Sequence, residues 1–123
     1  MCDLKRRVAL VVDDEMAIAK TLAAILNRAG FDAYAVLSAE EATERLATLQ
    51  PDLLITDVVM GRMNGIELAI TARNKLPNCK ILLFSGQATI IDLLEKARAQ
   101  GYEFDILPKP IHPTHLLAKL RGE

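Results

Sequence analysis

The chain has 123 residues, close to the usual size of one domain, and 51% of them are hydrophobic, which is enough for one core. Fifteen basic residues stand against sixteen acidic ones, and the formal charge of -1 argues against a domain that grips nucleic acid or anionic lipid electrostatically. The N-terminal residues lead into an apolar run too short for a signal-peptide core or a membrane span. We therefore expect one cytoplasmic domain over residues 1–123 that binds neither nucleic acid nor membrane.

Short apolar runs alternate with amphipathic stretches along the whole chain. The apolar runs predict strands over about residues 7–12, 32–36, 52–57, 80–85 and 103–107. The amphipathic stretches between and after them predict helices over about residues 15–29, 39–49, 64–76, 87–100 and 113–121. The first, third and fourth runs are apolar almost throughout, as in strands covered on both faces, whereas the second and fifth are patchier and suit the edges of a sheet.

Helix start signals agree with these boundaries. Ser38, with Glu41 three residues later, predicts a capping box, and Asn64 can cap the next helix. Strand–helix units with short connections indicate right-handed crossovers and a parallel sheet with helices on both faces. The expected fold is therefore α/β, a doubly wound, flavodoxin-like (βα)5 sheet with strand order 2-1-3-4-5.

Polar residues follow the predicted strands where each strand ends. In the expected strand order these residues meet beyond the carboxyl ends of the strands; they are Asp13, Asp14, Asp57, Ser85 and Lys109. Clustered carboxylates repel one another, so they imply a bound cation. The lysine and the hydroxyl nearby imply a bound anion as well.

Four sequence fragments in this order carry a family likeness. They are V-V-D-D-E at 11–15, D-V-V-M-G-R-M-N-G at 57–65, L-F-S-G at 83–86 and K-P at 109–110. Through them the chain resembles the receiver domain of bacterial two-component response regulators over essentially its whole length. The resemblance implies that Asp57 accepts a phosphoryl group from a histidine kinase, a phosphotransfer protein or a small phosphodonor. It also implies a Mg²⁺ site made by Asp13, Asp14, Asp57 and the backbone carbonyl of Val59.

The residue types suit that chemistry. An aspartate can attack phosphorus, but its charge opposes an incoming phosphoryl group that is also negative. A hard cation such as Mg²⁺ and the point charge of Lys109 neutralise both. Ser85 would then hydrogen-bond to the phosphoryl group and bias a surface made of the fourth helix, the fifth strand and the fifth helix. Such a domain phosphorylates itself once and is not a turnover enzyme.

Four positions depart from, or add to, the family pattern. Gly61 and Gly86 stand where the family commonly has proline and alanine. Ile106 stands where the family generally carries the tyrosine or phenylalanine that moves with the hydroxyl residue. Pro110 stands where the family usually has a cis peptide, although trans is the general base rate. The signalling step can therefore differ from the family's usual one, while the phosphorylation step looks intact.

Several alternatives stay open on sequence alone. The chain can be a protein-binding module that has lost phosphorylation; an aspartyl-phosphate hydrolase is less favoured because Val59, not an acid, stands two residues after Asp57. Asp13 and Asp14 can be simple helix caps, and Lys109 can lie extended at the surface. We interpret His112 and His115 as exposed residues at a helix start. The output partner or domain is not named by the sequence, which also leaves open whether the chain belongs to a longer protein.

Overall fold

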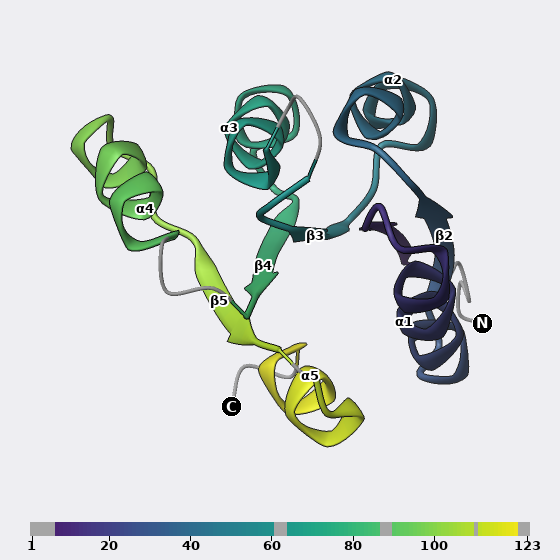
Figure 1. The fold of residues 1–123 in the computed structure, drawn as a ribbon. Helices are drawn as coiled ribbons and strands as arrows, with labels where there is room; N and C mark the ends of the chain where they lie inside the picture. The colour runs from purple at the N-terminus through teal and green to yellow at the C-terminus, as the bar shows by residue number, and fades with distance from the viewer. Residues whose placement is uncertain (1–6, 61–63, 87–89, 110, 121–123) are drawn as a thin grey trace.

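The computed structural model describes residues 7–60, 64–86, 90–109 and 111–120 (Figure 1). Two positions discussed above, Gly61 and Pro110, lie outside these ranges. Strands and helices alternate along the chain, in the order β1 (Val8–Val12), α1 (Met16–Arg28), β2 (Asp32–Val36), α2 (Ala39–Leu49), β3 (Leu53–Asp57), α3 (Gly65–Lys75), β4 (Lys80–Ser85), α4 (Ile90–Ala99), β5 (Asp105–Pro108) and α5 (Pro113–Leu120). None of the helices in the described ranges is long and apolar enough to cross a bilayer.

The strands form one parallel sheet in the order β2-β1-β3-β4-β5, which confirms the predicted flavodoxin-like topology. β5 begins two residues later than predicted, because its first paired residue is Asp105, opposite Leu82 of β4. The strand lies at the edge of the sheet and contains Pro108. An edge strand tolerates proline because amides on its free side have no strand to bond with.

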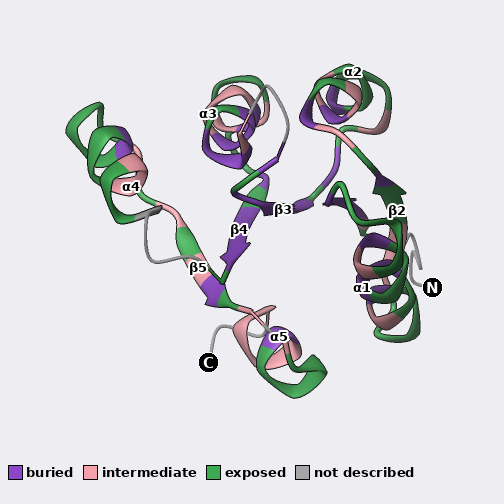
Figure 2. Ribbon diagram, viewed as in Figure 1, coloured by how far each residue is buried: buried purple, intermediate pink, exposed green. Residues whose placement is uncertain are grey.

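Helices cover both faces of the sheet (Figure 1). Side chains of α2, α3 and α4 pack on one face, and side chains of α1 and α5 pack on the other. β3 is buried along its whole length, and β4 is buried after its first residue (Figure 2). This burial explains their continuous apolar sequences, because neither face of these strands meets water.

Two helix starts fall where the caps predict them. The Ser38 hydroxyl accepts the Glu41 amide at 3.1 Å at the start of α2. At α3 the box is complete: the Asn64 side chain accepts the Glu67 amide at 2.8 Å, and the Glu67 carboxylate accepts the Asn64 amide at 3.1 Å. The start of α3 is thus fixed a few residues beyond the end of β3, where the polar residues gather.

Candidate functional site

Three carboxylates come together beyond the carboxyl ends of β1 and β3. Asp13, Asp14 and Asp57 each offer an oxygen, and these oxygens lie within 4.8 Å of one another; we call them the acidic cluster. Asp13 is 0% exposed and Asp57 7% exposed, whereas Asp14 is open to solvent. They meet because β1 and β3 are neighbours in the sheet and end at the same edge.

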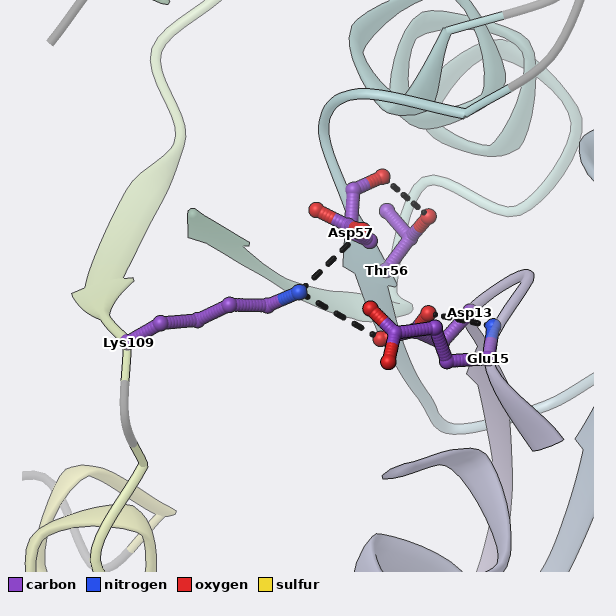
Figure 3. Close-up of polar contacts among 5 residues, drawn as sticks. All are labelled: Asp13, Glu15, Thr56, Asp57 and Lys109. Atoms are coloured by element: carbon purple, nitrogen blue, oxygen red, sulfur yellow. Dashed lines mark hydrogen bonds and ion pairs between the residues drawn. The ribbon is translucent and has the colours of Figure 1, made fainter. Parts of the chain in front are cut away.

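Lys109 reaches this cluster from the end of β5 (Figure 3). Its Nζ lies 3.3 Å from Asp57 Oδ2 and 3.5 Å from Asp13 Oδ2. The side chain is 24% exposed and crosses the sheet edge to reach two buried acids. Lys109 is therefore directed into the site, which excludes the alternative of a lysine extended along the surface.

The hydrogen bonds at the start of α1 test whether Asp13 or Asp14 is a helix cap. The N-cap of α1 is Glu15, which makes no side-chain capping bond, so neither Asp13 nor Asp14 is the cap residue. Asp13 Oδ1 accepts the Glu15 amide at 2.8 Å. The other oxygen, Oδ2, is buried and accepts no hydrogen bond from any described residue. The Lys109 ammonium lies 3.5 Å from Oδ2, which is an ion pair but not a hydrogen bond, so this buried oxygen can still take a second cation as a partner.

Negative charge exceeds positive charge at the acidic cluster among the described residues. Burial raises the pKa of Asp13 and that of Asp57; the Lys109 charge opposes this in both, but the net pKa is raised. Burial lowers the pKa of Lys109, yet the Asp57 and Asp13 carboxylates outweigh it and the net pKa is raised. Among the residues that the structure describes, three carboxylates against one ammonium leave an excess of two negative charges. A divalent cation matches that excess.

Ser85 and Val59 adjoin the cluster through their backbones. The Ser85 carbonyl accepts the Lys109 amide at 3.1 Å, and the Ser85 side chain is buried. The Val59 backbone lowers the pKa of Asp57, while the Val59 side chain is exposed. The Ser85 backbone therefore helps to place Lys109, and the Val59 backbone favours the ionised form of Asp57.

Sequence reasoning missed two residues that support Asp57. The Thr56 hydroxyl, fully buried, donates to the Asp57 carbonyl at 3.0 Å. Gly65 passes so close to the same carbonyl that a Cβ at this position would overlap the oxygen, and its amide donates to the Val58 carbonyl at 2.8 Å. The Asn64-Gly65 pair was the available signal, since such a pair often marks a tight chain reversal.

Gly65→Ala is expected to destabilise the protein by about 1–3 kcal/mol, because α3 must move away from the Asp57 carbonyl. Helix propensity alone predicts the opposite sign, since alanine is favoured over glycine in a helix. Urea unfolding measures the difference. Gly86→Ala is the matched control: among the described residues its Cβ would meet only the Lys109 Cβ at 3.4 Å, an ordinary contact. Equal stabilities of the two variants would contradict the close approach.

The family model for the response regulator receiver domain matches residues 9–121. The chain belongs to this family. Receiver domains of two-component response regulators are phosphoacceptors, generally not enzymes, and they bind Mg²⁺ at an acidic pocket. The family resemblance drawn from the four sequence fragments is therefore confirmed.

Similar proteins agree with this assignment. The receiver domain is 34% identical over 109 residues to the DNA-binding transcriptional regulator NtrC of Azospirillum brasilense, covering 89% of the chain and 22% of that protein. It is 28% identical over 122 residues to the DNA-binding response regulator MtrA of Mycobacterium bovis, covering 98% of the chain and 51% of that protein. The structure of the Vibrio cholerae chemotaxis protein CheY4 matches with a TM-score of 0.84 and 25% identity, covering 96% and 98% of the two chains. The chain thus spans about a fifth of this NtrC and half of this MtrA.

β5 of this receiver domain (Asp105–Pro108) carries no aromatic side chain. Ile106 is half-buried and packs against the core on the α2–α4 face. The nearest ring in sequence, Phe104, stacks on Tyr102 with 6.3 Å between centroids, and the Arg73 guanidinium lies 5.7 Å from its centroid. Phe104 therefore packs with Tyr102 and Arg73 just before the start of β5, at the opposite end of this strand from Lys109.

His112 and His115 are both exposed, as expected for the start of α5. Their rings lie 5.4 Å apart between centroids in an edge-on arrangement. Neither belongs to a cluster of three or more metal-ligating side chains within the described part of the chain.

Proposed function

We propose that Asp57 is the phosphoacceptor of a single receiver domain over residues 1–123 in the cytoplasm. One observation carries the proposal. A nearly buried carboxylate shares its surroundings with two further carboxylates within 4.8 Å and with an ammonium at 3.3 Å. This arrangement gives Asp57 what an attacking carboxylate needs, namely a fixed position and nearby positive charge.

Mg²⁺ would be held by Asp13, Asp14, Asp57 and the backbone carbonyl of Val59, and when bound it neutralises charge on the acids and on the phosphoryl oxygens. An Asp57 carboxylate oxygen attacks phosphorus and forms the new O–P bond. The bond between phosphorus and the donor breaks, and its electron pair leaves with the donor. The Lys109 ammonium lies where it can donate to a phosphoryl oxygen. The Thr56 hydroxyl helps to keep the Asp57 backbone in place through its hydrogen bond to the Asp57 carbonyl.

The response to phosphorylation is proposed to begin at Ser85. Its hydroxyl donates to a phosphoryl oxygen, and its carbonyl already joins β4 to the amide of Lys109. A small movement of Ser85 therefore acts on the start of the β5–α5 connection. We propose that this movement shifts the surface made by α4, β5 and α5 between two conformations. In this chain Ile106 stands on that surface in place of an aromatic switch residue.

The phosphoryl donor is proposed to be a histidine kinase or a phosphotransfer protein. The output lies with a partner protein or with another domain. NtrC and MtrA are named as DNA-binding, but the match covers only a part of each. We propose that this domain itself does not bind nucleic acid, since its charge is nearly balanced.

Intact-mass spectrometry after incubation with acetyl phosphate and Mg²⁺ tests the proposed reaction. We expect a single addition of about 80 Da, the mass of one phosphoryl group. The addition should disappear when EDTA replaces Mg²⁺, because the acidic cluster then keeps its uncompensated charge. An unchanged mass with Mg²⁺ present would favour the protein-binding module that is not phosphorylated. Sustained turnover of a phosphoester would instead favour a hydrolase.

A further inference from the structure

Phe84 occupies the position between Asp57 and the strand that carries Lys109. In the sheet register Asp57 pairs with Phe84, and Phe84 pairs with Leu107. Paired residues of parallel strands project their side chains on the same face, and so do residues two apart in one strand. Lys109 directly follows β5, two residues after Leu107. Its side chain passes over the Phe84 ring on the way to the acids at the ends of β3 and β1.

The Lys109 ammonium contacts the Phe84 ring as well as the acids. Nζ lies 5.1 Å from the ring centroid, while it lies 3.3 Å from Asp57 Oδ2 and 3.5 Å from Asp13 Oδ2. The face of an aromatic ring carries negative potential and attracts a cation at this separation. The attraction is stronger here than on an open surface, because Phe84 is fully buried and Lys109 is largely shielded.

The ring is held far more firmly than the lysine. Phe84 is one of the largest fully buried side chains and packs in the core beneath α1 and α5, together with Leu107 and Leu116. A lysine, in contrast, has four flexible carbons and a point charge that two carboxylates alone do not orient. The ring supplies a third, rigid contact for the ammonium.

We infer that Phe84 is a positioning residue for phosphoryl transfer. Its ring holds the Lys109 ammonium over β4, at the place from which it meets a phosphoryl group on Asp57. The inference rests on the proposed function of Asp57. It assigns a role to an aromatic side chain on the opposite face of the sheet from Ile106, in the core packed by α1 and α5.

Fluorinated phenylalanines at position 84 test the role of the ring. Each added fluorine weakens the negative potential of the face with little change in shape. Trifluorophenylalanine at position 84 should lower the rate of phosphorylation by acetyl phosphate roughly two- to tenfold, and mono- and difluorinated rings should fall between. The same substitution at Phe104, whose cation is Arg73 beyond the other end of β5, should leave the rate unchanged. A rate that stays constant or rises with fluorination at position 84 would overturn the inference.

A double-mutant cycle in metal-free protein measures the contact between Phe84 and Lys109 without any phosphorylation. Trifluorophenylalanine at position 84 should raise the unfolding equilibrium constant roughly two- to tenfold with Lys109 present, and the rise should vanish in Lys109→Met. An equal rise in both backgrounds would show that the ring acts by packing alone and would overturn the inference, as would no rise in either. If the unmodified protein gains no phosphoryl group, the proposed function fails, while the cycle still decides whether Phe84 holds Lys109.

Discussion

Asp57→Asn is expected to lose phosphorylation completely within the sensitivity of intact-mass spectrometry. An amide oxygen does not form a stable acyl phosphate, and the substitution also removes one charge from the acidic cluster. Removing the attacking group of a catalytic site typically costs more than about a thousandfold in rate. The mass increase of about 80 Da seen with acetyl phosphate and Mg²⁺ should therefore be absent.

Asp105→Asn is the matched control for Asp57→Asn. Asp105 is an exposed aspartate at the start of β5, at the opposite edge of the sheet from the acidic cluster. This variant should be phosphorylated like the unmodified protein. An Asp57→Asn protein that still gains the phosphoryl group would show that another side chain is the acceptor.

Asp13→Asn is expected to change stability and Mg²⁺ binding in opposite directions. The folded protein raises the pKa of Asp13 above its ordinary value, chiefly through burial. The folded state therefore favours the protonated form of Asp13. As the pH rises from the ordinary pKa through the folded-state pKa, Asp13 ionises and the free energy of unfolding falls. Metal-free Asp13→Asn should be more stable at pH 7 by on the order of 1 kcal/mol, and this gain should shrink toward pH 4.

Mg²⁺ reverses the ranking of these two proteins. A ligand at 100 times its dissociation constant stabilises the folded state by about 2.7 kcal/mol, and the unmodified protein should gain this at such a Mg²⁺ concentration. Asp13→Asn loses the charge of a proposed Mg²⁺ ligand, whose buried Oδ2 is paired only with the Lys109 ammonium among the described residues, so it should gain little. Urea unfolding at pH 7 with Mg²⁺ or with EDTA measures both effects. Equal stabilisation of the two proteins by Mg²⁺ would remove Asp13 from the metal site.

The sequence predicted the fold because its strongest signals are local. β3 and β4 are continuous apolar runs, and both are buried on two faces in the centre of the sheet. The convergence of Asp13 and Asp57 also followed from local signals, since each acid stands where an apolar strand runs out and the strand order makes those strands neighbours. The expectation that polar residues at the ends of neighbouring parallel strands lie close together thus located the acidic cluster.

The missed residues depend on contacts between distant parts of the chain. Nothing near Phe84 in the sequence indicates that the Lys109 side chain crosses its ring, because this follows from the register of β4 with β5. Gly65 is similar: its need for a missing Cβ comes from the Asp57 carbonyl, which the connection after β3 brings against the start of α3. Residue type and spacing in the sequence do not indicate such contacts between distant parts of the chain.

The most direct test of the whole account is to locate the phosphoryl group chemically. Borohydride reduces an aspartyl phosphate to homoserine, which tandem mass spectrometry of the digested protein can place in the sequence. The account predicts homoserine at position 57 after treatment with acetyl phosphate and Mg²⁺, and unmodified aspartate at positions 13 and 14. Homoserine at either of those positions, or a phosphoryl group that leaves no homoserine at all, would contradict it.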